Sequence, residues 1–340
     1  EFFGTRPRFR PLHDVMREAG QKFDATAFYP QIADAVDDAS GRIQTLPLAL
    51  SLPVLFTNRA ALRKAGLDPD QPVKTWWDLQ KVAGQIYDSG GKCPLTTARF
   101  AWIHSENVSS QAGEASVAKV GSAEKVQVNG MVNVKHLALL ASWQKSRYFH
   151  YSGPGREGNR RFLSGECAML TGESSLYADA RRAGIDVGIA ALPHYDDVYG
   201  PKPADTLPDG AGLWILAGHK KEEYKLAARF VEFMLRPEVQ TEWAKATSYL
   251  PMTPAGLNGL RDSGTPKHLL DAAEKRLSAT RKGSMRVKHG PVRDRLREFM
   301  GEEVAAVWTT DKPAKEALDN VARRVDTAPA APAGAAPMRK

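Results

Sequence analysis

The sequence predicts an α/β protein with parallel sheets, divided into two lobes. Short apolar runs typical of buried strands alternate with segments of helical periodicity along most of the chain. The 340 residues are too many for one small hydrophobic core, so two lobes are expected. Hydrophobic residues make up 42% of the chain and charged residues 25%, as is typical of a globular protein, and we find no internal repeat.

In the first third of the chain, proline, glycine and helix-capping residues mark the ends of the elements. Pro47 and Pro53 interrupt an apolar segment that otherwise reads as a buried strand. Thr75 stands where a helix cap is expected, ahead of apolar residues at helical spacing. The elements expected here are a short helix ending near Gly20, an extended segment over 44–58, helices over 59–65 and from 75 to 86, and a strand over 93–97.

The remainder of the chain continues this alternation. The helix over 222–235 has a clear apolar face and must end before Pro237. A segment rich in Gly, Pro and Asp over 206–212 predicts a loop, and the apolar run over 213–217 predicts a buried strand. Further helices are expected over 132–144, 159–163, 292–308 and 314–325 and through Trp243, further strands over 167–170 and 187–193, and disorder over the Ala/Pro-rich residues 327–340.

The charge balance favours a small anionic partner over nucleic acid. The net charge is +8, from 47 Lys and Arg against 39 Asp and Glu. The basic residues are spread along the chain, and the densest groups, within 156–161 and 281–297, are short. A solvated basic surface or the attraction of a small anion explains such a pattern, whereas nucleic acid would need a longer basic stripe.

The two cysteines leave two readings open. Cys93 and Cys167 have no CxxC motif and no companion His at ligand spacing, so a zinc site is not expected. In an oxidising compartment the pair would form one disulfide, and otherwise the two would be buried free thiols. The sequence indicates neither a metal nor a cofactor.

No group of residues predicts catalysis. Residues 153–158 match the pattern GxGxxG, but no buried strand precedes them, and Pro154 removes one N–H group that a dinucleotide loop needs. We interpret them as a surface turn. No Ser, His and Asp arrangement stands out among the eight histidines. A binding protein is therefore expected rather than an enzyme.

Four segments, in this order and spacing, resemble the extracellular solute-binding proteins of the maltodextrin and glycerophosphate class. They are 58–79, which includes Pro72-Val-Lys-Thr-Trp-Trp-Asp-Leu79, followed by 162–169, 187–193 and 230–254. Closer features resemble the glycerol-3-phosphate branch of that family. Among them are Trp102-Ile-His-Ser-Glu-Asn107 and Gly210-Ala-Gly-Leu-Trp214.

The resemblance implies a two-lobe periplasmic-binding-protein fold of type II, with hinge strands between the lobes and the ligand in the cleft. The lobes would comprise residues 1–47 plus 212–252, and 48–211 plus 253–326. The family begins with a strand–helix–strand unit that contributes a Tyr and a Glu to the site, and this chain starts after it. We therefore expect an incomplete first lobe with unpaired strand edges, and poor binding or marginal folding of the chain by itself.

The family's ligand contacts correspond here to residue types that suit a phosphate ester. Hydroxyl groups, backbone N–H groups and a forked guanidinium bind phosphate oxygens, and Trp102 would form a flat wall for glycerol carbons or a choline group. Gly210 would allow close approach of the backbone. The implied contacts are Ser51, Trp102, Ser174, Gly210, Tyr249 and one arginine of the penultimate helix, either Arg297 or, one turn earlier, Arg293.

Several of these residues also suit a purely structural role. Trp102 and Tyr249 are of types that pack in protein cores, and the serines are of a type that ends strands. An ungapped alignment would put Glu173 in place of Ser174, and a carboxylate would repel phosphate. At Arg99 the family member from enteric bacteria has a second Trp, whose loss is expected to shift preference toward a larger or more anionic glycerophosphodiester.

The function implied by the resemblance is capture of glycerol 3-phosphate, or a glycerophosphodiester such as glycerophosphocholine, for an ABC importer. The partners would be the small organophosphate and the permease subunits in the membrane. The protein would be a monomer, located in the periplasm or on the outer side of the cytoplasmic membrane. A carbohydrate receptor of the same family is the alternative. A glycerophosphodiester hydrolase is a third reading, which lacks a visible nucleophile or metal site.

Overall fold

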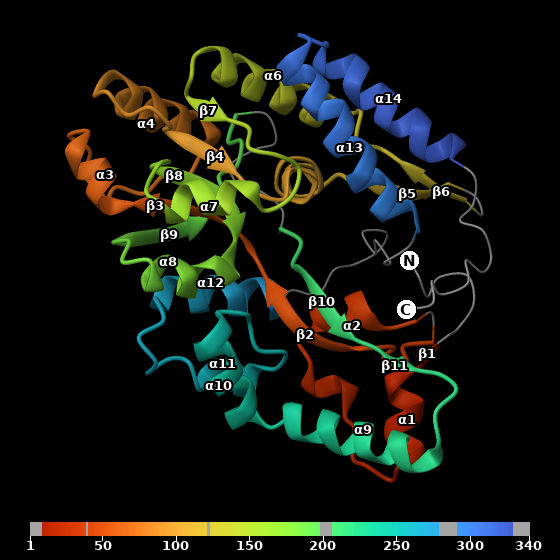
Figure 1. Ribbon diagram of the computed structural model, residues 1–340. Coiled ribbons are helices and arrows are strands. Elements are labelled where there is room, and N and C mark those ends of the chain that lie inside the picture. Colours follow the sequence, from red (N-terminus) through yellow and green to blue (C-terminus); the bar gives the residue numbers. More distant parts are fainter. Residues whose placement is uncertain (1–8, 39, 121–122, 198–205, 279–290, 329–340) are drawn as a thin grey trace, which may run out of the picture.

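The apolar segment over 44–58 forms two consecutive strands that connect the two halves of the molecule (Figure 1). Strand β2 (Leu46–Ser51) pairs antiparallel with β10 (Asp209–Leu213), and β3 (Pro53–Asn58) enters a larger sheet. The break expected at Pro53 is confirmed, whereas Pro47 lies within β2. The structure is a computed structural model that describes residues 9–38, 40–120, 123–197, 206–278 and 291–328.

The larger sheet has five strands of mixed direction. Their order is β7, β4, β8, β3 and β9, with β4 parallel to β7 and β8, and β3 antiparallel to β8 and β9. The prediction of parallel sheets therefore holds for β4 and its neighbours only, because β3 runs against both of its own neighbours. The bounds are Leu95–Thr97 for β4, Phe149–His150 for β7, Met169–Glu173 for β8 and Val187–Ala191 for β9.

Both faces of this sheet are buried, because alternate residues of β3 pack into different cores. Leu55 belongs to a large core formed with four long helices, whereas Val54 and Phe56 pack on the opposite face with Phe162 and Leu170. The four helices are α4 (Trp76–Asp88), α6 (Met131–Lys145), α13 (Pro291–Thr309) and α14 (Ala314–Thr327). In Figure 1, α6, α13 and α14 lie together at the top.

A second core joins residues 12–52 to a later part of the chain, and its helices fill the lower half of Figure 1. The expected division placed residues 253–326 with 48–211, but Leu257 and Leu270, from α11 and α12, pack in this second core. The lobe boundaries otherwise remain predictions. The elements are α1 (Leu12–Glu18), α2 (Pro30–Val36), β11 (Ile215–Leu216), which pairs with β1 (Phe9–Arg10), α9 (Lys221–Met234), α10 (Pro237–Thr247), α11 (Pro254–Asn258) and α12 (Lys267–Ser278).

Strand β10 occupies part of the segment that was predicted to be a loop over 206–212. The strand begins at Asp209, and its glycines permit it to approach β2 closely. A Cβ atom at Gly210 would lie only 1.8 Å from the carbonyl oxygen of Ala49, so a side chain has no space there. The predicted buried strand over 213–217 is divided between Leu213, the last residue of β10, and the two-residue strand β11, in which Leu216 is exposed.

The two cysteines form a disulfide, which decides between the two readings of the sequence. Cys93 and Cys167 are 74 residues apart and lie just before β4 and β8. These two strands are parallel neighbours in the five-stranded sheet. The disulfide therefore joins two segments that the sheet already places side by side.

The helix ends agree closely with the sequence pattern. Thr75 caps α4 by accepting a hydrogen bond from the Asp78 N–H at 3.0 Å, and the Asp78 carboxylate accepts one from the Thr75 N–H at 3.0 Å. The helices predicted over 132–144, 159–163, 222–235, 292–308 and 314–325 are confirmed as α6, α7, α9, α13 and α14, with ends that differ by at most two residues.

Short elements connect these layers. In the described part of the chain, no helix is both long and apolar enough to cross a bilayer. Most of the tail expected to be disordered, residues 329–340, lies outside the described residues. The remaining elements are α3 (Arg59–Lys64), α5 (Asn107–Gln111), β5 (Val117–Val120), β6 (Ala123–Val126), α7 (Glu157–Leu163), α8 (Tyr177–Arg182), two 3-10 turns (Ala25–Ala27 and Ser174–Leu176) and a π-helix (Trp102–Glu106).

Candidate functional site

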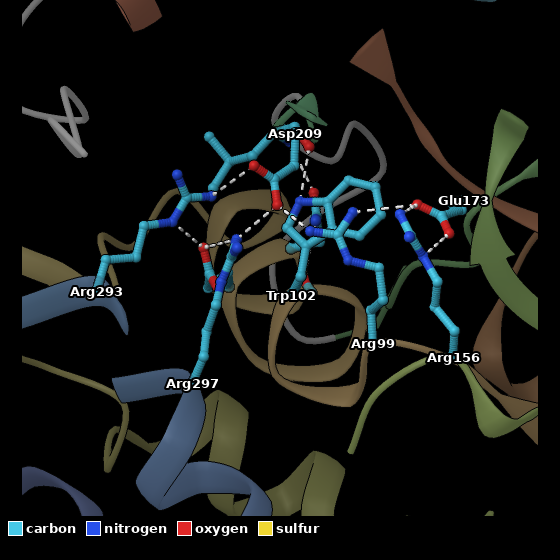
Figure 2. Close-up of polar contacts among 10 residues, drawn as sticks. Arg99, Trp102, Arg156, Glu173, Asp209, Arg293 and Arg297 are labelled. Carbon is cyan, nitrogen blue, oxygen red and sulfur yellow. Dashed lines mark hydrogen bonds and ion pairs between the residues drawn. The ribbon is translucent and has the colours of Figure 1, made fainter. Parts of the chain in front are cut away.

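Seven charged side chains from separate parts of the sequence meet beside the start of β10, and we name them the arginine cluster. Figure 2 shows Arg293 and Arg297 extending from α13 toward Asp209, and Arg99 lying between Asp209 and Glu173. The members are Arg99 after β4, Glu106 in the π-helix, Arg156 before α7, Glu173 at the end of β8, Asp209 at the start of β10, and Arg293 and Arg297 in α13.

Two arginines one helical turn apart share the buried carboxylate of Glu106. The Nε atom of Arg293 donates to Glu106 at 2.8 Å, and that of Arg297 donates at 2.6 Å. The Glu106 side chain is only 2% exposed. Burial by itself would raise the pKa of Glu106, but Arg293 and Arg297 outweigh it and lower the pKa below its usual value. Glu106 is therefore an ionised counter-charge that holds both guanidinium groups in place.

Asp209 is the second buried counter-charge, and three arginines share it. Arg99 donates to its carboxylate, a terminal nitrogen of Arg297 donates at 2.9 Å, and Arg293 forms an ion pair at 3.7 Å. The Asp209 side chain is 3% exposed. Burial opposes ionisation, but these arginines and the Gly210 N–H hold the pKa of Asp209 far below its usual range. A carboxylate with this many donors is ionised throughout the physiological pH range.

The third carboxylate, Glu173, ties the cluster to a more exposed arginine. Arg156 donates to Glu173 at 2.9 Å, and Arg99 donates at 3.3 Å. The Arg156 side chain is 59% exposed. Its pKa is raised, first by the hydrogen bond to Glu173 and to a smaller degree by Tyr249 and Asp209, so both of these lie near it. Arg156 is therefore the member that solvent reaches most easily.

The π-helix places Trp102 and Glu106, and one amide side chain ties it to the segment before β10. The amide nitrogen of Asn107 donates to the Trp102 carbonyl at 2.9 Å, and its oxygen accepts from the Leu207 N–H at 2.7 Å. The indole N–H of Trp102 donates to the Leu207 carbonyl at 3.2 Å. These bonds fix the segment that leads to Asp209. Widened turns of this kind are frequent at functional sites.

Arg99 covers the residue that was expected to form an open aromatic wall. Trp102 is buried, and the Cζ atom of Arg99 lies 4.5 Å from the centroid of its ring. Arg99 itself has a φ of 51°, in the left-handed region that side chains other than glycine rarely adopt. Backbone strain of this kind persists where the surrounding structure holds it in place, and it is concentrated at binding sites.

The structure brings most of the residues implied by the family into this neighbourhood. Ser51 is paired in register with Asp209, is buried, and its hydroxyl oxygen has no hydrogen-bond partner among the described residues. Gly210 follows Asp209 in β10, and Tyr249 is half-buried near Arg156. That these residues share one binding site stays a prediction.

Ser174 and the two candidate arginines are distinguished by their surroundings. The hydroxyl of Ser174 accepts a hydrogen bond from the Leu52 N–H at 3.0 Å, between β2 and β3, and its neighbour Glu173 is the residue in the cluster. The side chain of Arg293 is 7% exposed and that of Arg297 is 26% exposed. Arg297 is therefore the more accessible of the two to a ligand.

Sequence reasoning missed two of the three acidic members of the cluster and one of its arginines. Asp209 fell within a predicted loop, Glu106 fell within a motif that was read for its tryptophan, and Arg156 fell within the predicted surface turn. Their partners lie far away in the sequence, since 191 residues separate Glu106 from Arg297. The only signal for such a cluster would have come from its carboxylates, because a buried carboxylate must be paired with a positive charge.

The charges of the cluster suit an anion. Among the described side chains of the cluster, four guanidinium groups face three carboxylates, which is an excess of one positive charge. Forked guanidinium groups bind phosphate and carboxylate oxygens in pairs. Among the described residues, no group of three or more His, Cys, Asp and Glu side chains is placed to hold a metal ion. A pocket of about 190 Å³ adjoins the cluster along β2 and β10, and Asp209 and Gly210 line it.

Sequence comparison identifies relatives that cover most of the chain. The family model of bacterial extracellular solute-binding proteins matches residues 11–258. The sn-glycerol-3-phosphate-binding periplasmic protein UgpB of Escherichia coli K12 is 34% identical over 331 residues, which cover 93% of this chain and 74% of that protein. UgpB of Salmonella paratyphi A is similar to the same extent.

Solved structures share the fold at lower sequence identity. UgpB from Mycobacterium tuberculosis in complex with glycerophosphocholine matches with a TM-score of 0.73 and 18% identity, over 94% of this chain and 78% of that one. Maltose-bound MalE3 of T. maritima matches with a TM-score of 0.75 and 18% identity, over 94% and 80% of the two chains. These likenesses confirm the α/β periplasmic-binding-protein fold that was expected.

Proposed function

The chain belongs to the bacterial extracellular solute-binding proteins, and we propose that it is the receptor of an ABC importer that captures glycerol 3-phosphate or a glycerophosphodiester. The ligand would lie between the two lobes, close to the arginine cluster. Closure of the lobes around the ligand by a hinge motion would present the loaded form to the permease. The protein would bind its ligand without making or breaking a bond.

The observation that carries this proposal is the excess of one positive charge among the described side chains of the arginine cluster. Arg297 and Arg156 have exposed edges, and Arg99 lies between them against Asp209 and Glu173. A phosphate group placed there would accept hydrogen bonds from guanidinium groups whose positions Glu106 and Asp209 already fix. One relative is named as an sn-glycerol-3-phosphate-binding protein, and another was solved in complex with glycerophosphocholine, which supports the same class of ligand.

The remaining family contacts complete the proposed site. Ser51 would donate its unpartnered hydroxyl, Gly210 would offer backbone groups at close range, and Tyr249 would approach from the side of Arg156. Arg293 and Ser174 would act mainly by positioning, because each is buried and bonded to neighbouring protein groups. Trp102 would support Arg99 rather than contact the ligand directly.

A carbohydrate receptor is the second candidate, because the maltose-bound MalE3 shares this fold with a TM-score of 0.75. Carbohydrate sites rely on stacking aromatic rings and neutral hydrogen bonds, whereas Trp102 here is covered by an arginine. The charged cluster therefore favours an organophosphate. We further propose that the protein acts as a monomer in the periplasm, with permease subunits as its partners and no cofactor.

The proposal is tested by calorimetric titration with glycerophosphocholine, glycerol 3-phosphate and maltose, followed by phosphorus NMR of the recovered ligand. We expect at least one organophosphate to bind, maltose not to bind, and the ligand to be recovered intact. Binding of maltose alone would favour the carbohydrate receptor. Release of glycerol 3-phosphate from the diester would make the protein a hydrolase.

A further inference from the structure

The carboxylate of Asp209 occupies the position in the cluster where the arginines converge. Arg99, Arg293 and Arg297 all direct guanidinium groups at it, from two different segments of the chain (Figure 2). Its side chain is buried, and its pKa is held far below the usual range by these partners. Asp209 therefore permanently neutralises one of the positive charges that an anionic ligand would otherwise meet.

The number of charges in the cluster limits what it can take up. Among the described side chains, the four arginines face the three carboxylates of Glu106, Glu173 and Asp209, which leaves an excess of one positive charge. An ionic charge buried without a partner is strongly unfavourable, and the attraction between charges is strong in a poorly solvated site. One negative charge on a ligand is matched here, whereas a second one would face the three carboxylates.

We propose that Asp209 is a specificity-determining residue that selects a ligand with one negative charge on its phosphate over a ligand with two. The inference rests on the proposed function. A phosphodiester carries one charge, whereas a phosphomonoester carries about 1.5 to 2 charges at pH 7, because its second pKa is about 6. The cluster therefore favours phosphodiesters, and Asp209 is the buried carboxylate with the most arginine partners.

Arg99 does not widen this limit, although it adds a positive charge. The sequence led to the expectation that Arg99 would favour a more anionic diester. In the structure its guanidinium is already paired with Asp209 and with Glu173. Its charge is therefore used within the protein, and the preference for a larger diester would have to come from the shape of the site.

The test compares glycerol 3-phosphate with its methyl diester, two ligands that differ only in the charge and the methyl group of the phosphate. Binding of both is measured by calorimetry at pH 7.5 for the wild type and for Asp209→Asn. The wild type is expected to prefer the diester, and Asp209→Asn to reduce that preference about ten-fold, the effect of about 1.4 kcal/mol. Asp271→Asn, which removes an exposed carboxylate that pairs with Arg261 and Lys267, is the control with the same change in net charge.

A second variant keeps the test decisive if Asp209→Asn fails to fold. Glu173→Gln removes another carboxylate from the cluster on the side of the exposed Arg156, and it should reduce the diester preference in the same direction. An unchanged preference in the cluster variants that still bind would overturn the role of Asp209 and leave the proposed function in place. Failure of both ligands to bind a wild-type protein that shows a cooperative unfolding transition would instead overturn the proposed function, and the inference with it.

Discussion

The guanidinium of Arg99 lies against the ring of Trp102, with 4.5 Å between its Cζ atom and the ring centroid. The tryptophan is buried, so its aromatic face is used by the protein itself. The same guanidinium reaches Asp209 and Glu173, which makes Arg99 the link between the aromatic part and the ionic part of the site. A ligand would therefore meet Arg99 before it meets Trp102.

We expect Arg99 and Trp102 to be energetically coupled. A double-mutant cycle with Arg99→Met and Trp102→Leu, read by urea unfolding, should give a coupling free energy of about 0.5–2 kcal/mol, because each single change removes the contact between guanidinium and ring. The exposed pair of Arg236 and Phe233, with 5.7 Å between Cζ and centroid, is the matched control and should show weaker coupling. Strict additivity of Arg99→Met and Trp102→Leu would show that the contact has no energetic role.

Glu106→Gln is expected to destabilise the protein by about 3–5 kcal/mol, because it leaves the buried Arg293 and the half-buried Arg297 without their shared counter-charge. Chemical denaturation measures this change in the free energy of unfolding. The control is Glu302→Gln in the same helix as both arginines, which breaks an exposed pair with Arg324 and should cost less than about 1 kcal/mol. Similar losses in the two variants would mean that the pairing of Glu106 is not special.

Stability should fall as the pH drops below about 6.5, because two buried histidines are neutral in the folded protein. His104 and His136 are hydrogen-bonded to each other at 2.9 Å. Burial lowers the pKa of His136 to about 3 and, together with the neighbouring His136, lowers that of His104 well below its usual value. The unfolded chain binds these protons near pH 6.5 and the folded chain does not, so protonation favours unfolding.

The contribution of the neutral histidine pair to the free energy of unfolding is therefore fully present above pH 6.5. It declines between pH 6.5 and about 3, by up to about 1.4 kcal/mol per pH unit for each histidine. Glu106 and Asp209, whose folded pKa values are also lowered, add a further loss only below about pH 4.5. Unfolding midpoints between pH 7.5 and 4.5 check this prediction. His136→Gln should flatten the decline, the exposed His219→Gln should not, and equal slopes in all three proteins would contradict it.

Reduction of the disulfide should destabilise the protein without dismantling the five-stranded sheet. In the chain-entropy description, opening a loop of 74 residues between Cys93 and Cys167 costs about 2–5 kcal/mol. Thermal unfolding with and without reductant measures the difference. A variant with serine at both positions should show no response to the reductant, and a response of equal size in that variant would trace the effect to something else.

Much of the fold follows from local patterns in the sequence. Helices α4 and α14 carry one apolar face with capping or breaking residues at their ends, and these signals are complete within about a dozen residues. Strand β10 could not be found in this way. A side chain at Gly210 would meet the carbonyl oxygen of Ala49 on the neighbouring strand, and in the sequence a glycine required by such a distant backbone atom looks the same as a glycine of a loop.

The site, too, could be predicted from the sequence only in part. Arg293 and Arg297 stand one turn apart in a predicted helix, so their common direction was visible in the sequence. Their counter-charges were not, because Glu106 and Asp209 come from the π-helix and the start of β10 and pair with the two arginines only in the folded chain. Ion pairs between residues far apart in the sequence leave no periodic signal. The direction of β3 relative to its neighbours also depends on pairing between distant segments, so the sequence pattern did not show it either.

The central claim is that the arginine cluster binds the phosphate of the ligand, and the most direct measurement is calorimetry of Arg297→Ala with glycerophosphocholine. Arg297 is the more exposed of the two arginines in α13, so its loss should weaken binding by about 1–3 kcal/mol. Arg295→Ala, in the same helix and bonded instead to the Ala328 carbonyl, is the control and should bind normally. Wild-type affinity in Arg297→Ala would contradict the claim.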